Sequence, residues 1–208
     1  MFGRLRRKAE EWAAQGESGL ALAERWSAYG DEVRQVWPAR IRTGTVDGFE
    51  YLAFDAMIMA GGLRERRDSV RTISMVHLPV ALPDVRLRPR LLDEDELGPI
   101  PAVALEPPWN CDLLVRLRAM ALLESGDDPT GDLTAEADVP GVAEELVTRE
   151  VIDMSVLCGL IHWRVHARDL IFVSFPGAGV TVDVTPTVTN LAHIAQKFPQ
   201  VTLQKYGM

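Results

Sequence analysis

The chain has 208 residues but only two cysteines, Cys111 and Cys158. Their spacing fits no zinc or thiol redox motif, so we expect no metal site from these thiols. A reducing compartment with two idle thiols is expected, and an oxidised Cys111–Cys158 pair is the alternative. Apolar runs are far shorter than the about 20 residues that a membrane-spanning helix needs. The charged start has no apolar core after it, which predicts no signal peptide and a cytoplasmic protein.

Motifs that would announce a common enzyme are also missing. None of the 16 glycines precedes a lysine, which excludes a phosphate-binding P-loop. No G-x-S-x-G nucleophile elbow occurs, which excludes a common esterase arrangement. The acidic run Asp93–Glu96 fails as a calcium loop, because Leu97 and Ala104 stand where oxygen ligands belong. We therefore expect no cofactor, and we favour a protein that is not an enzyme.

His162 and His166 are the one histidine pair whose spacing invites a metal interpretation. Four residues apart on a helix, two imidazoles lie about one turn apart and share a metal. On a strand the same spacing separates the Cα atoms by roughly 13 Å, too far for direct chelation. Local alternation favours a strand, so we expect surface histidines and no metal.

The charge of −8 is unevenly distributed along the chain. Residues 61–90 carry seven arginines against three acidic residues, whereas residues 91–160 carry three arginines against sixteen. A basic strip and an acidic region either neutralise each other or face charged partners. The basic strip contains the candidate anion-binding residues Arg64, Arg66, Arg67 and Arg71. No aromatic residue is interleaved with them, which makes nucleic acid an unlikely partner.

Residues 1–38 are expected to form a helical arm. Leu5, Ala9 and Trp12 recur at helical spacing, and a similar apolar set follows near Trp26, before Pro38 ends the region. Tryptophan is enriched at binding hot spots, so Trp12 and Trp26 are candidate interface residues. Contact of residues 1–12 with an anionic membrane surface is the alternative to an oligomerising or solvated helix.

Residues 39–208 are expected to form a single α+β domain. Asp47-Gly48 predicts a hairpin, with strands before it and over 49–59. Strands are also predicted over 70–80 and 85–88, with Pro79 and Pro83 bracketing a turn. An acidic, proline-rich linker is expected near 91–110. Helices are predicted over 140–147, 150–159 and 187–198. Between the second and third helices, strands are predicted over 160–167 and 170–175, with a turn at 167–169. The fold class is an antiparallel sheet packed by helices.

Two stretches together resemble an uncharacterised bacterial domain family of unknown function. The first comprises Gly44–Phe49, Phe54 and Val76–Val85, and the last of these ranges contains the L-P-x-x-L-P motif at Leu78–Pro83. The second runs from Trp163 through His166 to Asp169-Leu170. Members of that family often carry transmembrane helices before this domain, where this chain has its Trp-bearing region. The resemblance implies a scaffold and carries no activity or catalytic residue.

Function is expected to be that of a non-catalytic interaction or assembly module. It would self-associate or dock on a protein partner through its helical arm. One alternative is a hydrolase whose acid/base site is assembled by the fold. Another is an anion- or nucleotide-sensing module that uses the Arg64–Arg71 strip.

Overall fold

The computed structural model describes residues 36–58, 69–90, 121–124, 126, 129–174 and 183–207. By its contacts the chain divides into two compact units. Of the described residues, unit 1 comprises 36–58, 69–77, 173–174 and 183–189, and unit 2 comprises 78–90, 121–124, 126, 129–172 and 190–207. The expected helical arm falls on residues outside the described part, except that Val36, Trp37 and Pro38 belong to the first strand.

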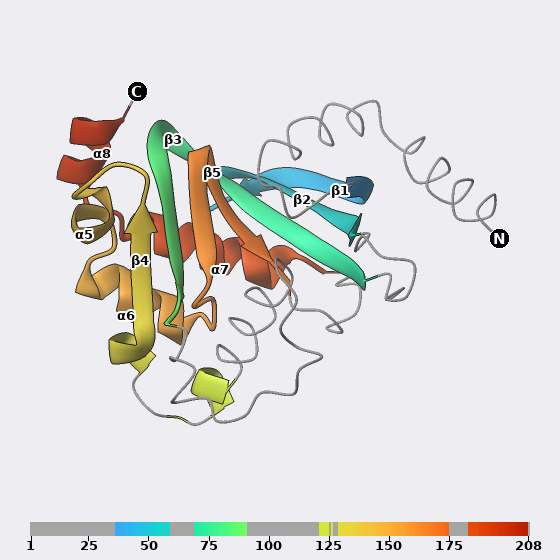
Figure 1. The fold of residues 1–208 in the computed structure, drawn as a ribbon. Helices are drawn as coiled ribbons and strands as arrows, with labels where there is room; N and C mark the ends of the chain where they lie inside the picture. The colour runs from blue at the N-terminus through green and yellow to red at the C-terminus, as the bar shows by residue number, and fades with distance from the viewer. Residues whose placement is uncertain are drawn as a thin grey trace. The chain divides into compact units, whose positions relative to one another are not determined.

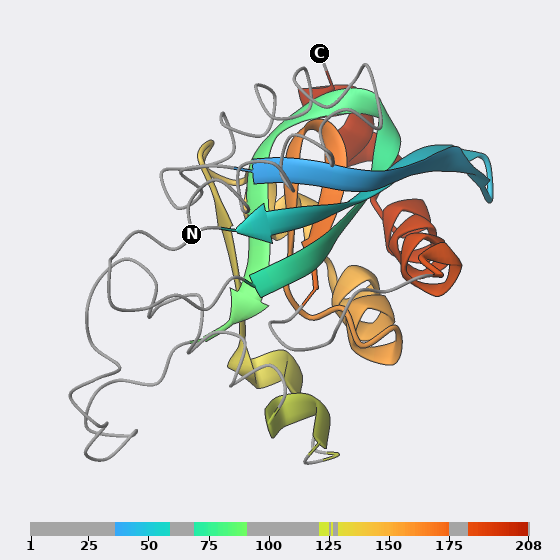
Figure 2. The same ribbon diagram turned by 90° about the vertical axis from the view of Figure 1, so that its right-hand side faces the viewer.

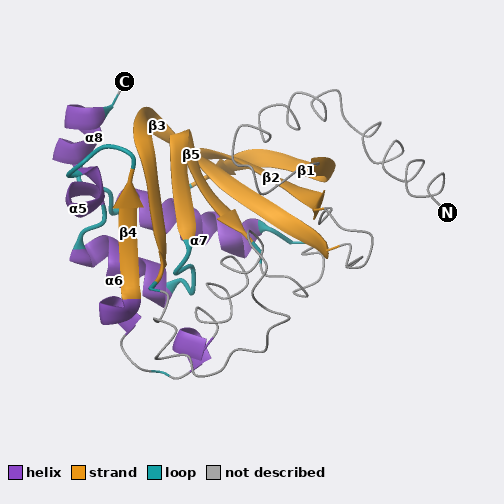
Figure 3. Ribbon diagram, viewed as in Figure 1, coloured by secondary structure: helices purple, strands orange, loops and turns teal. Residues whose placement is uncertain are grey.

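An antiparallel sheet of five described strands confirms the expected α+β class (Figures 1 and 3). The strand order is β1-β2-β3-β4, and β5 also pairs with β3. The strands are β1 (Val36–Val46), β2 (Phe49–Ile58), β3 (Ser69–Pro89), β4 (Leu133–Ala137) and β5 (Trp163–Val173). The helices of the described part include η2 (Pro129–Asp132), α5 (Val142–Leu146), α6 (Arg149–Leu157), α7 (Thr185–Gln196) and α8 (Gln200–Tyr206).

Unit 1 is built on the β1–β2 hairpin and the first part of β3, which lie side by side in Figure 2. Asp47 and Gly48 have φ values of 48° and 86°. Two successive left-handed residues make the tight turn that suits the twist of paired strands, so the predicted hairpin is confirmed. The buried apolar residues of this unit are Leu52, Ala53, Phe54, Ile73, Met75, Val76, Val184 and Val188.

Unit 2 packs helices against one face of its strands. Trp163 on β5 is buried, and its Nε1 donates a hydrogen bond to the hydroxyl of Ser155 on α6 at 3.0 Å. The ring of Phe198 lies 5.8 Å from the Trp163 ring. Thr202 on α8 donates to the carbonyl of Glu145 on α5 at 3.0 Å. These contacts join α5 with α8 and α6 with β5, so the helical side of unit 2 is a packed layer.

β3 corrects the expected turn between Pro79 and Pro83. It is one strand of 21 residues, from Ser69 to Pro89. Proline fixes φ at a value compatible with extended backbone and removes only one hydrogen-bond donor, so two prolines do not force a chain reversal. The predicted turn was wrong, and both strand predictions describe parts of β3.

β5 corrects the turn expected at residues 167–169 in the same way. The strand runs without a break from Trp163 to Val173. Ala167 has a φ of 50°, a left-handed value that a β-strand takes up as a local irregularity without ending. The predicted helices over 140–147, 150–159 and 187–198 are confirmed as α5, α6 and α7, whereas β4 and α8 were not predicted.

Within the described part of the chain, no helix is both long and apolar enough to cross a membrane.

Candidate functional site

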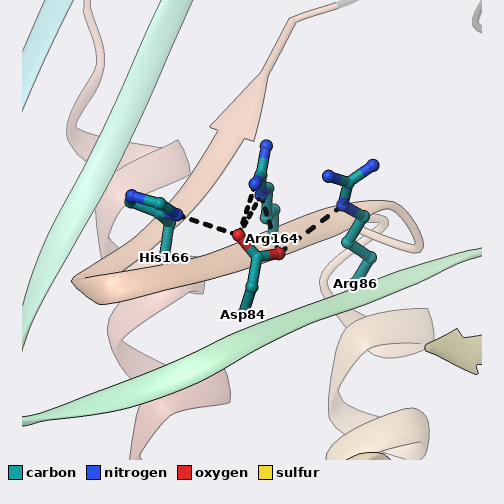
Figure 4. A network of polar contacts seen from close by, with 4 residues as sticks. All are labelled: Asp84, Arg86, Arg164 and His166. Carbon is teal, nitrogen blue, oxygen red and sulfur yellow. Dashed lines mark hydrogen bonds and ion pairs between the residues drawn. The ribbon is translucent and has the colours of Figure 1, made fainter. Parts of the chain in front are cut away.

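A cluster of charged side chains joins β3 to β5 in unit 2. Trp163 and Val165 are buried on the helix-packed face, so strand alternation places Arg164 and His166 on the opposite face. Asp84 on β3 meets them there, although it lies 80 residues from Arg164 in the chain. Figure 4 shows both side chains and Arg86 converging on the Asp84 carboxylate.

The Asp84 carboxylate is almost fully buried, with 7% of its side chain exposed. Arg164 Nε donates to both of its oxygens at 2.8 Å, and Arg164 Nη2 also donates to Oδ2. His166 Nδ1 lies 2.8 Å from Oδ2. Because an ionised carboxylate only accepts, the proton of that bond belongs to His166. Arg86 Nε completes the set with an ion pair at 3.5 Å.

These contacts determine the protonation state of Asp84. Burial raises its pKa, but hydrogen bonds from Arg164 and His166, together with the charges of Arg164 and Arg86, outweigh burial and hold the pKa below 3.8. Asp84 is therefore ionised throughout the physiological range. A carboxylate whose lone pairs are occupied by guanidinium and imidazole groups orients its partners and does not donate a proton.

Asp84 is expected to make the stability of the folded chain fall in acid. Its pKa is below 3.8 in the folded state and returns to about 3.8 on unfolding, so its contribution is present above pH 3.8 and is lost as pH falls through the folded-state pKa. The difference in urea midpoint between the wild type and Asp84→Asn should therefore shrink between about pH 5 and pH 2. Urea unfolding at constant ionic strength measures it, and a difference that does not change with pH would contradict the assignment.

The neighbouring strand extends the charged face. Arg86 lies opposite Glu136 in the β3–β4 register, and Arg88 lies opposite Thr134. Arg88 Nη2 donates to Glu136 Oε1 at 2.5 Å, across the diagonal between the two strands. Both partners are exposed by more than a third, so this pair contributes little to stability. The pair instead fixes the position of Arg88, so that Arg86 and Arg88 form a row of arginines along β3.

A second charged cluster lies in unit 1, around Asp55 on β2. The side chain of Asp55 is 1% exposed, and it accepts hydrogen bonds from Arg40 Nε at 2.5 Å, Arg42 Nη2 at 2.9 Å and the hydroxyl of Thr72 at 2.9 Å. Its three donors come from β1 and β3, the strands on either side of β2. The buried carboxylate therefore ties three strands together.

A bulge in β1 brings Arg40 to this carboxylate. The register places Ala39 opposite Asp55 and Arg42 opposite Ala53, so Arg40 and Ile41 face a single residue of β2. Arg40 has a φ of 49°, which is uncommon for a residue other than glycine. The left-handed conformation turns Arg40 out of the normal alternation, so that its guanidinium reaches Asp55.

Most residues singled out from the sequence lie outside the described part of the chain. This is so for Arg64, Arg66, Arg67, Trp12, Trp26 and Cys111. Arg71 is described only in its backbone, where it pairs with Ala56. The anion-binding and interface assignments therefore stay predictions. Cys158 is a half-buried thiol whose pKa is raised by burial.

The histidine pair is described. His166 lies on β5, as the strand interpretation expected, whereas His162 lies just before the strand begins at Trp163. His162 packs edge-on against Phe172 at 5.0 Å, and His166 binds Asp84. Among the described side chains, no group of three or more histidine, cysteine, aspartate or glutamate residues is placed to hold a metal ion.

Asp55 and Asp84 are the site residues that sequence reasoning missed. Asp55 stands in the apolar run Leu52–Ile58 and Asp84 directly follows the apolar run Leu78–Pro83, and that local contrast was the available signal. Asp84, Arg164 and His166 also fall inside the two stretches that carry the family resemblance. What the sequence did not contain was the pairing of β3 with β5 that joins them.

No protein family model matches the chain, so the resemblance to an uncharacterised bacterial domain family is not confirmed. No curated protein matches it either. Among solved structures, the chain is similar to the crystal structure of the mycobacterial trehalose monomycolate transport factor A, TtfA. The TM-score is 0.47 and the identity is 14%, over 95% of this chain and 93% of that chain. A likeness at this level assigns no function.

Proposed function

We propose that this chain is a non-catalytic interaction or assembly module that self-associates or docks on a protein partner. The state of Asp84 is the observation that carries the proposal. Its carboxylate is held ionised by Arg164, Arg86 and His166, and the Arg86 side chain is itself half exposed. Such a network holds the arginine and histidine side chains in fixed directions on the sheet face. Charged groups with fixed directions can recognise a complementary surface on a protein partner.

The hydrolase alternative finds less support in the same cluster. An acid/base site needs a carboxyl or imidazole whose pKa lies near the working pH. The pKa of Asp84 moves away from neutrality, and His166 Nδ1 is committed to its carboxylate. The anion-sensing alternative rests on four arginines of the Arg64–Arg71 strip. Arg64, Arg66 and Arg67 lie outside the described residues, and Arg71 is described only in its backbone.

The N-terminal helical arm is our proposed contact for self-association or docking, and cytoplasmic location belongs to the same proposal. Deletion of residues 1–35 leaves β1 whole, because that strand begins at Val36. We expect the deletion to lower the oligomeric mass, since it removes the two tryptophans proposed for the interface. Sedimentation velocity at matched concentrations measures the change.

A full-length pair of variants controls this deletion. Trp12→Ala with Trp26→Ala should reproduce the loss of mass, whereas Gln15→Ala with Ser18→Ala, two polar changes in the same region, should not. An unchanged mass after both the deletion and the tryptophan substitutions would refute the role of the arm in self-association.

A further inference from the structure

β4 is an edge strand of unit 2, and within the described ranges it pairs with β3 alone (Figure 1). The N–H of Arg90 donates to the carbonyl of Asp132, and the N–H of Asp138 donates to the carbonyl of Asp84. The even-numbered residues of this segment therefore direct their backbone groups at β3. The odd-numbered residues direct theirs outward, and they are Leu133, Ala135 and Ala137. No hydrogen bond from the described part of the chain reaches those outward N–H and C=O groups.

The two faces of β4 differ in chemistry. Its odd-numbered residues lie opposite Val85, Leu87 and Pro89 of β3, which are buried on the helix-packed face. At the edge the apolar row is less well covered, because Leu133, Ala135 and Ala137 are only half-buried. The even-numbered positions lie on the open face and are mostly acidic. They are Asp132, Thr134, Glu136 and Asp138.

β3 shows which kind of sequence pairs with this strand. Along the inner side of β4 it runs Val85-Arg86-Leu87-Arg88, in which apolar and basic residues alternate. The apolar side chains join the buried face, and Arg88 binds Glu136 on the open face. The outer side of β4 presents the same two faces to a further strand, with unpaired backbone groups between them.

A second copy of β4 does not suit this edge. Antiparallel pairing of two β4 strands about Ala135 would place Asp132 opposite Asp138, and Thr134 opposite Glu136. Like charges directly opposite each other destabilise a strand pair. The same acidic row repels nucleic acid, whose phosphates are negatively charged. Charge complementarity therefore favours a basic strand from another protein.

We propose that the outer side of β4 binds an extended segment of a protein partner, in which basic and apolar residues alternate, as an added antiparallel strand. Its basic side chains lie beside Glu136 and Asp138, and its apolar side chains cover the half-buried row. The antiparallel direction follows the rest of the sheet, in which β1, β2, β3 and β4 pair antiparallel. This inference rests on the proposed docking function and assigns it a contact outside residues 1–38.

A capped seven-residue peptide of alternating valine and arginine tests the site on the full-length chain. In antiparallel pairing the valines lie opposite Leu133, Ala135 and Ala137, and their N–H groups point at β4. N-methylation of the valine amides should weaken binding at least about tenfold, whereas N-methylation of the arginine amides should not. Fluorescence anisotropy of the labelled peptide measures the dissociation constant. Equal binding of the two methylated peptides, or weaker binding of the arginine-methylated one, would overturn the proposal.

A charge reversal on the open face tests the acidic row. Glu136→Lys with Asp138→Lys should weaken binding of the arginine peptide at least about tenfold, and should favour a peptide with glutamate in place of arginine. Glu144→Lys with Glu150→Lys is the matched control, because it changes the net charge equally at exposed helix positions. It should bind as the wild type does at an ionic strength of about 0.15 M, where charges beyond about 8 Å are screened. Equal loss in both variants would overturn the assignment of the acidic row.

A proline in β4 tests the backbone contact without any change of charge. Ala135→Pro removes one outward N–H and spares the bonds to β3, because that N–H points away from β3. It should abolish peptide binding, and the methylated peptides carry the test if this variant fails to fold. The chain without residues 1–35 should bind the peptide as the full chain does. No binding to the wild type would overturn this inference while leaving the arm proposal standing.

Discussion

Replacing Asp55 with alanine is expected to lower the free energy of unfolding by about 3–5 kcal/mol, the range for removing one partner of a buried ion pair. The side chain is 1% exposed and accepts from Arg40, Arg42 and Thr72. The substitution removes the negative charge with which the Arg40 and Arg42 guanidiniums form ion pairs. Arg40 is nearly half exposed and can turn to water, so most of the cost comes from Arg42, which is 20% exposed.

Urea unfolding followed by far-UV circular dichroism measures this loss. Thr72→Val is the matched control, since it removes one neutral donor from the same carboxylate and should cost about 1 kcal/mol. Asp55→Asn keeps the shape and removes the charge, so it separates the ion pair from packing. A loss for Asp55→Ala no larger than that for Thr72→Val would show that the arginines are fully solvated in the folded chain.

Replacing Asp84 with alanine is expected to cost about 2–3 kcal/mol, somewhat less than loss of a fully buried partner. The expected loss of unfolding free energy is smaller because the main partners of Asp84 are partly exposed: Arg164 is 23% exposed and His166 is 33% exposed. Water can reach both after the substitution. The change also releases Arg86, so the row of arginines on β3 should lose its fixed direction.

Glu136→Ala provides the control for Asp84 on the same face. It removes the carboxylate of an exposed pair with Arg88 and should change stability by about 0–1 kcal/mol. The same urea titration applied to both variants gives the comparison. Equal losses would mean that burial of the Asp84 carboxylate contributes nothing, and the cluster would then be an ordinary surface ion pair.

Local chemistry explains which elements were predictable. The β1–β2 hairpin follows from Asp47-Gly48, because few residue pairs accept two left-handed conformations in succession. Helix α5 follows from the spacing of Val142, Leu146 and Val147, which are buried in the structure, and α6 follows from Thr148, which stands at its N-cap position. In each case the signal lies within a few residues of the element it specifies.

The errors share a physical cause. Pro79, Pro83 and the residues around Ala167 have strong local turn preferences, yet each lies inside a long strand. Pairing with neighbouring strands stabilises extended backbone by many hydrogen bonds together, which outweighs a preference of about 1 kcal/mol at single positions. A short strand such as β4 is set by its ladder with β3 and by little in its own sequence.

The sequence by itself determined the α+β class, the hairpin and the separation of charge along the chain, because periodicity, turn chemistry and composition are local properties. Only the tertiary structure decided where that charge acts. Asp84 meets Arg164 across 80 residues because β3 pairs with β5, and Asp55 meets Arg40 because a bulge turns one residue out of alternation. Strand pairing and register depend on contacts between distant segments, and no window of the sequence contains them.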